Sequence, residues 1–328
     1  MINYRPKVFD EASKSHASKK LYAILLAFIV VMGIILILES IIPAIVSTKP
    51  MLEEMNENGY LENPDNFNFQ ESMKLAMKVS SSPSAMIPTL LSTIFGTVTA
   101  IFYCRCIEMR PVRSMGARKE GFFSHYITGI ITGIILMSAI TLLSVALGVN
   151  KIEICHGVNY KVIALYLLGF IVQGMSEEFI FRGYLMTTIG GAGYHTGIAV
   201  MISAVAFALA HAANPGFGVV PFINLTLFGV FAALHVVVFD NIWGICAIHS
   251  IWNFTQGNFY GISVSGSNNT ESVFRTTAVS DKAFLTGGEF GIEGSIFTTL
   301  ILSIGIASSI YLIYKRQQLQ QKKQPSQE

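Results

Sequence analysis

The sequence is poor in charge. Of its 328 residues only 13% are Asp, Glu, Lys or Arg, whereas an ordinary soluble protein has about 25%. Stretches without a charged residue, such as 79–104, 121–150 and 183–239, exceed the ~20 apolar residues that cross a bilayer. With 52% hydrophobic residues and a net charge of only +2, the composition excludes a soluble globule with a single core, a disordered chain and a nucleic-acid binder.

Cysteine is also scarce. The four cysteines lie in or beside apolar segments and none is spaced CxxC: Cys104, Cys106, Cys155 and Cys246. The sequence therefore predicts neither a disulfide framework nor a zinc knuckle. The sequence also predicts no cleavable signal peptide, because the first apolar run, 21–38, has no small-residue cleavage site. That run is predicted to be a retained span.

Hydropathy predicts an all-α fold, a polytopic transmembrane helical bundle of eight spans. The spans cover roughly 21–45, 85–106, 122–148, 160–188, 194–213, 217–239, 241–257 and 292–314. Prolines are expected to limit them: Pro43 and Pro50 close the first span, and Pro83 and Pro88 open the second. The Gly-, Ser- and Asn-rich stretch 258–291 is predicted to be a long outside loop.

The basic residues predict the orientation. They gather in the N-terminal tail, in 105–120 and in the C-terminal tail, whereas 48–78 holds six acidic residues and three lysines. Because cytoplasmic loops are enriched in Lys and Arg, these three basic segments should face the cytoplasm. An even number of spans then puts both termini there. We expect a multi-pass protein of the cell membrane.

A few ionisable side chains fall inside apolar spans. Placing each of them in the membrane costs a free energy of ~2.5–3.5 kcal/mol on insertion scales, so each needs a polar partner or a functional role. Glu177, Glu178 and Arg182 lie in the fourth span. Glu178 and Arg182 are spaced i and i+4, the favourable order for an ion pair. Glu177 points about 100° away, without a local cation, which suits a general acid or base. Alternatively, all three form a buried network that fastens helices together.

Histidines occupy the following spans. His211 is one turn after Phe207 and just before Asn214-Pro215, while His249 and Asn253 are one turn apart and could aim donors at one point. Each alone is typical of a core residue, but three such positions in consecutive segments favour a site. His235 has no carboxylate or amide at helical spacing and is predicted to be structural. The remaining histidines, His16, His125, His156 and His195, carry no signal.

Together these motifs resemble the signature of the CAAX-protease and bacteriocin-processing family, which includes the type II CAAX prenyl endopeptidases. They are Glu177-Glu178-x-x-x-Arg182, Phe207-x-x-x-His211 and His249-x-x-x-Asn253. The resemblance is close over 160–257 and looser around 114–116 and 287–294. It implies an N-terminal tail and accessory helices in 1–150 and a catalytic core in 151–328, within one membrane domain, with the core opening toward the cytoplasm.

The resemblance also implies roles. Glu177 with His211 would activate a water, His249 and Asn253 would stabilise the oxyanion, and Glu178 with Arg182 would support them. Glu177, His211 and His249 could instead form a His₂Glu zinc set. No HExxH motif is present, and Asn253 is a better oxyanion donor than a zinc ligand. We therefore favour a reaction without a metal or other cofactor.

The sequence thus predicts an intramembrane endopeptidase. Its partners would be the lipid bilayer and a membrane-associated protein or peptide substrate, not nucleic acid. One alternative is a non-catalytic immunity factor that binds a bacteriocin or its receptor and keeps the motifs as a structural network. Another is an ion- or proton-coupled transporter, which the lack of internal repeats disfavours.

Overall fold

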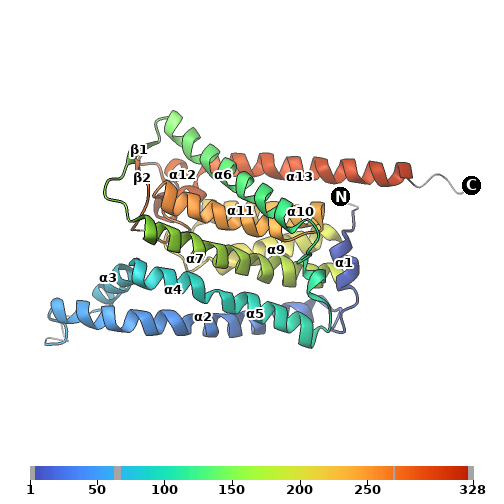
Figure 1. Ribbon diagram of the computed structural model, residues 1–328, viewed down its shortest axis with the longest axis horizontal. Coiled ribbons are helices and arrows are strands. Elements are labelled where there is room, and N and C mark those ends of the chain that lie inside the picture. Colours follow the sequence, from blue (N-terminus) through green and yellow to red (C-terminus); the bar gives the residue numbers. More distant parts are fainter. Residues whose placement is uncertain (1–3, 63–67, 269, 324–328) are drawn as a thin grey trace, which may run out of the picture.

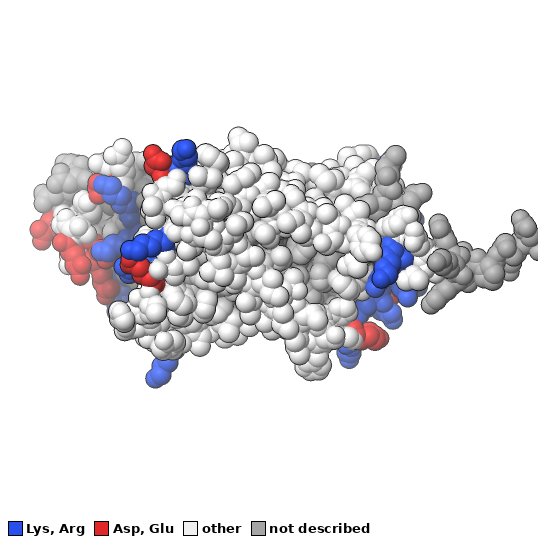
Figure 2. Space-filling view, turned by 90° about the horizontal axis from the view of Figure 1, so that it is seen from above, with Lys and Arg blue, Asp and Glu red and all other residues white. Residues whose placement is uncertain are grey.

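The protein is a bundle of long, roughly parallel helices with a small β-sheet at one end (Figure 1). The computed structural model describes residues 4–62, 68–268 and 270–323. Figure 2 shows a broad uncharged belt between two charged ends, as expected of a helix bundle that crosses a bilayer. The chain is a polytopic helical membrane protein, as predicted.

Within the described ranges, six helical stretches are long and apolar enough to cross a membrane. They are α2 (Leu21–Glu57), Pro83–Ile107, α6 (Phe122–Ala146), Tyr160–Gly191, α10 (Val219–Phe239) and α13 (Ile296–Lys323). The other two predicted spans are shorter: α9 (Thr196–Ala210) has 15 residues, and α11 (Trp243–Phe254) has 12. All eight predicted ranges are largely helical, and the number of complete crossings stays a prediction.

Several of these stretches contain changes of helix type. Pro83–Ile107 consists of α4 (Pro83–Ser92), α5 (Ile94–Phe102) and the π-helix η2 (Tyr103–Ile107). Tyr160–Gly191 consists of α7 (Tyr160–Glu178), the π-helix η4 (Phe179–Met186) and α8 (Thr187–Gly191). A third π-helix, η5 (Thr255–Phe259), continues α11. Single π-helical turns in α-helices are frequent at functional sites, and η4 begins directly after Glu178.

The prediction that Pro43 and Pro50 close the first span is wrong. Both lie inside α2, which continues to Glu57 and has 37 residues. At 1.5 Å per residue this helix is about 55 Å long, well beyond a hydrocarbon core of about 30 Å. A proline removes one hydrogen bond and bends a helix, but neighbouring turns and packing can maintain it. Here α2 packs along α4 and α5.

The predicted outside loop is partly structured. Its strand β2 (Phe274–Ala278) pairs antiparallel with β1 (Asn150–Ile154), so that Asn150 faces Ala278 and Ile154 faces Phe274. This two-stranded sheet was not expected in an all-α fold. It joins the connection between α6 and α7 to the loop that follows α11. Short helices complete the segment: α12 (Ala283–Thr286), η6 (Gly288–Phe290) and η7 (Ile292–Gly294).

The centre of the bundle is formed by α7, which packs against α4 and α5 on one side and α11 on the other. Close approach depends on small residues, as is common between membrane helices. A methyl group placed on Gly174 would lie 2.6 Å from the backbone nitrogen of Ser250 in α11. This contact sets α7 and α11 side by side at the level of Glu177 and His249.

The N-terminal tail is not simply solvated. Its helix α1 (Lys7–Ala12) buries Val8, Phe9 and Ala12, and Phe9 packs on Gly190 of α8. The Val8 N–H donates to the carboxylate of Asp240 at 3.1 Å. The remaining elements are η3 (Val112–Met115) and α3 (Phe69–Ser80).

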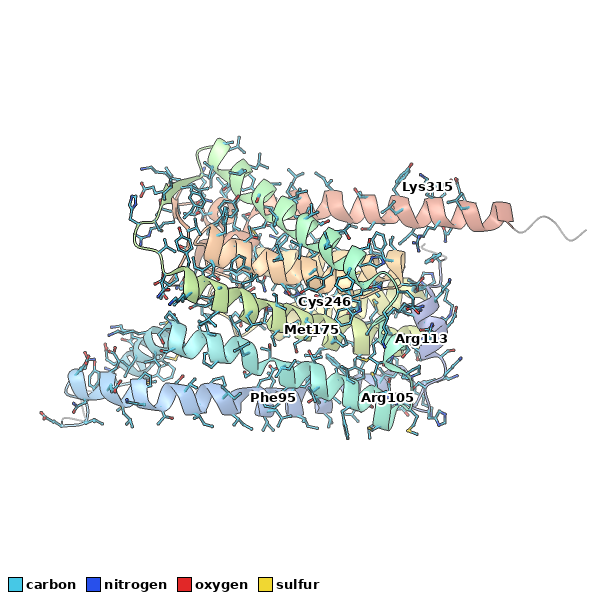
Figure 3. All side chains as sticks on the ribbon, viewed as in Figure 1. Phe95, Arg105, Arg113, Met175, Cys246 and Lys315 are labelled. Carbon is cyan, nitrogen blue, oxygen red and sulfur yellow. The ribbon has the colours of Figure 1, made fainter. Side chains whose placement is uncertain are left out.

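The two ends of the bundle differ in charge. Arg105, Arg113 and Lys315 lie toward the end that also holds α1, whereas Met175 and Cys246 lie nearer the middle (Figure 3). The sheet and the end of α2 form the opposite end, which carries most of the acidic residues. All four cysteines are free thiols, as predicted.

Candidate active site

The four residues predicted to be catalytic line one cavity. Glu177, His211, His249 and Asn253 surround a volume of about 140 Å³. Its lining comes from α4, α7, α9, α10 and α11 and from the segments around 214, 264–267 and 293. Residues that lie between positions 177 and 253 of the sequence therefore line the same cavity.

Two glutamates hold His249 between them. The His249 Nδ1 atom lies 2.8 Å from Glu178 Oε1, and its Nε2 atom lies 3.6 Å from Glu177 Oε2. The imidazole ring is also packed edge-on against the rings of Phe207 and Phe228. His249 is 4% exposed, so its orientation is fixed by both hydrogen bonding and packing.

The predicted ion pair is present and fully buried. Arg182 donates to Glu178 Oε1 at 3.0 Å, and both side chains are 0% exposed. The guanidinium also lies 4.6 Å from the centre of the Phe207 ring, within the range of a cation–π contact. Glu178 thus joins Arg182 to His249, and this network lies directly behind the cavity wall.

A residue that sequence reasoning missed, Gln173, connects the two sides of the site. Its amide nitrogen donates to Glu177 Oε1, and its carbonyl oxygen accepts from the Asn253 amide at 2.9 Å. Gln173 is one turn before Glu177 in α7 and also lines the cavity. The i, i+4 spacing was available in the sequence, but an uncharged amide in an apolar span did not stand out.

His211 approaches from another direction. Its Nδ1 atom lies 2.9 Å from the carbonyl oxygen of Phe207, and because that carbonyl can only accept, Nδ1 carries the proton. The Nε2 atom is then an acceptor on a ring that lines the cavity. His235, predicted to be structural, packs on Phe239 with ring centres 4.6 Å apart and does not line the cavity.

A further buried carboxylate, that of Glu293, also lines the cavity. Glu293 accepts from Trp252 Nε1 at 3.2 Å, and from the backbone N–H and the hydroxyl of Ser265 at 2.8 and 2.9 Å. Asn214 also donates to the Ser265 carbonyl oxygen at 2.9 Å. The looser resemblance over 287–294 includes Glu293, but nothing in the sequence placed it at the cavity.

Part of the cavity lining lies toward the end of the bundle that carries the sheet. The residues around 214 and 264–267 follow the ends of α9 and α11 that lie away from α1 and the basic segments. The side to which the cavity opens stays a prediction.

The residues present do not form an evident metal site. Among the described residues, no three His, Cys, Asp or Glu side chains are grouped so that they could hold an ion. Of the alternative zinc set, Glu177 and His249 are adjacent, and His211, whose Nδ1 atom faces a backbone carbonyl, lines the same cavity. The zinc set stays the alternative that the sequence left open.

Comparison with protein families gives a match. Residues 159–255 match the family described as type II CAAX prenyl endopeptidase Rce1-like. We refer to these residues, which are similar to that family, as the Rce1-like segment. Comparisons with curated proteins and with solved structures found no match.

The Rce1-like segment contains all the residues that the motifs predicted. Glu177, Glu178, Arg182, His211, His249 and Asn253 lie within it, as does Gln173. It is carried by α7 to α11. Glu293 and α4 lie outside it, so part of the cavity wall is built by segments beyond the family match.

Proposed function

We propose that the protein is an intramembrane endopeptidase that hydrolyses a peptide bond of a membrane-associated protein or peptide. The observation that carries this proposal is the convergence of Glu177, His211, His249 and Asn253 on one small polar cavity within an Rce1-like segment. A carboxylate, an imidazole acceptor and an amide donor around a volume that holds a few waters are the groups that peptide hydrolysis requires.

Glu177 is proposed as the general base. Its Oε1 atom accepts from Gln173, and its buried Oε2 atom has no hydrogen-bond partner among the described residues. A buried unsatisfied oxygen is a binding position for water. That water would lose a proton to Glu177 as its oxygen attacks the scissile carbonyl carbon. The same proton would then pass to the leaving nitrogen as the C–N bond breaks. The Nε2 acceptor of His211 would orient the water.

Asn253 and His249 are proposed to stabilise the oxyanion. The Asn253 amide uses one of its two protons on Gln173, which leaves one for the substrate. His249 must be an imidazolium to donate from Nε2 to the oxyanion and from Nδ1 to Glu178 at the same time, because a neutral imidazole carries only one N–H proton. Glu177 and Glu178 would then balance the charges of Arg182 and His249. No step requires a metal, and we propose a metal-free reaction.

This function predicts a specific effect of His211→Ala on the membrane proteome. Cells that carry the variant should accumulate at least one uncleaved precursor that wild-type cells process, because the water loses its acceptor. Quantitative proteomics of membrane fractions would measure it. His235→Ala is the matched control, since His235 also lies in an apolar helix but outside the cavity, and it should leave processing intact.

The same comparison separates the alternatives. If both histidine variants process every substrate like the wild type, while His211→Ala abolishes protection against a bacteriocin, the protein is a binding or immunity factor. Equal processing without such a phenotype would overturn the proposed function outright.

We further propose that the chain crosses the membrane eight times with both termini in the cytoplasm. The basic end holds Arg105, Arg113 and Lys315 (Figure 3), and Lys- and Arg-rich ends remain on the cytoplasmic side. The segments around 214 and 264–267, which line part of the cavity, then lie toward the outside of the cell.

Natural cysteines make the orientation testable. Cys155 is partly exposed beside β1, whereas Lys119 is exposed at the basic end. In a Cys106→Ser background, an impermeant maleimide should label Cys155 on intact cells, because this end faces outward. The variant Cys155→Ser, Lys119→Cys in that background should be labelled only after the cells are lysed. Labelling in the opposite order would show that the bundle is inserted the other way round.

A further inference from the structure

A second carboxylate approaches the candidate base from the accessory helix α2. Glu39 follows an apolar run in that helix, and no positively charged side chain pairs with it among the described residues. It does not line the cavity, and the sequence analysis did not single it out. An intramembrane carboxylate without a cation partner requires either polar partners or a functional role.

The partner of Glu39 is revealed by a notch in α5. A methyl group placed on Gly96 would lie 2.7 Å from Glu39 Oε1 and 2.5 Å from Ser176 Oγ. Ile180 Cδ1 lies 2.8 Å from the same point, so the missing side chain of Gly96 lets the carboxylate of α2 and the hydroxyl of α7 approach each other closely over the backbone of α5. Phe95, labelled in Figure 3, marks this level of α5. Ser176 is the residue directly before Glu177.

Ser176 has a buried hydroxyl group that needs a hydrogen-bond partner. Its side chain is 0% exposed, and its Oγ atom has no hydrogen-bond partner among the described residues. Buried hydroxyls are almost always paired with protein or with an ordered water. The Glu39 carboxylate, which also interacts electrostatically with Glu177, is the polar group on the other side of the notch.

We propose that Glu39 is a positioning residue for the candidate base. Its carboxylate holds the hydroxyl of Ser176 across Gly96, and so fixes the last turn of α7 that carries Glu177. This inference rests on the proposed peptidase function and extends the active site into α2, beyond the Rce1-like segment. The orientation of a catalytic carboxylate would then depend on a helix that contributes nothing to the cavity wall.

The experiment compares four variants of the full-length protein in liposomes, with a substrate identified from the precursor that His211→Ala accumulates. Gly96→Ala fills the notch, and Glu39→Leu removes its polar wall. Both should lower kcat about 10- to 100-fold, as expected when a catalytic group is misplaced by about 1 Å, with KM unchanged. Glu39→Gln keeps a hydrogen-bonding amide and should restore kcat to within about threefold of the wild type. Gly33→Ala is the matched control, because nothing lies within 4 Å of a methyl group there.

Thermal unfolding of each variant in the same detergent separates positioning from folding. The proposal holds if kcat falls in Gly96→Ala and Glu39→Leu while the melting temperature stays near that of Gly33→Ala. Wild-type kcat in both variants would overturn it. A loss in Glu39→Gln equal to that in Glu39→Leu would also overturn it, since hydrogen bonding would not then be the relevant property. An inactive wild-type protein would instead contradict the proposed function itself.

Discussion

Replacing Glu177 with Gln should reduce kcat for peptide hydrolysis by about 10²- to 10⁴-fold, the usual contribution of a general base. The amide keeps the shape of the side chain and can still accept from Gln173, so the cavity should be preserved. It cannot, however, take a proton from the attacking water. The measurement is a cleavage assay with purified protein in liposomes, together with a binding assay for the uncleaved substrate.

A matched control for this variant lies on the surface. Glu153→Gln removes a carboxylate from the sheet, where Glu153 pairs only with Lys151 at 2.7 Å, and should leave kcat unchanged. Substrate binding by Glu177→Gln should also stay close to that of the wild type, because the base acts only in the transition state. Hydrolysis at the wild-type rate would remove Glu177 from the reaction.

Replacing Arg182 with Met should cost the largest amount of folding stability of any single change considered. The guanidinium is fully buried against Glu178, and removing one member of a buried ion pair typically costs about 3–5 kcal/mol because the other charge remains uncompensated. The melting temperature in detergent should fall sharply, and cleavage should be lost with it. Differential scanning fluorimetry with a thiol-reactive dye, which reports exposure of the buried Cys246, would measure the change.

The double variant Arg182→Met, Glu178→Gln tests whether the uncompensated charge of Glu178 causes the loss of stability in Arg182→Met. Neutralising Glu178 removes the orphaned charge, so the double variant should recover a large part of the lost melting temperature. It should remain inactive, because His249 loses the carboxylate that holds its Nδ1 atom. If the double variant is less stable than Arg182→Met alone, the ion pair is not the source of the stability.

The motifs could predict the residues of the site because each pair occupies one face of one helix. Glu178 with Arg182, and His249 with Asn253, are spaced four residues apart, and this spacing alone fixes their proximity. The ordering of the spans was equally accessible, since bilayer thickness determines how long an apolar run must be. These parts follow from local geometry.

The missed features depend on long-range packing. Glu293 reaches the cavity only because the loop after α11 folds back over it, and Glu39 matters only because Gly96 lets α2 and α7 approach. Neither contact has a periodicity along the chain. Gln173 was overlooked for a different reason: its amide is neutral, so it carries little of the insertion cost that made the glutamates conspicuous.

The limits of α2 show a further kind of error. Proline marks a helix end reliably in water, but in α2 the helix continues through Pro43 and Pro50.

The docking of α1 has a consequence for biosynthesis. Arg5 donates to the carbonyl oxygen of Gly190 at 3.0 Å, a partner that is 185 residues later in the chain. The apolar side chains Val8 and Phe9 are therefore translated long before the surface that buries them exists. The α1 segment can therefore reach its final contacts only after α7 and α8 have been made.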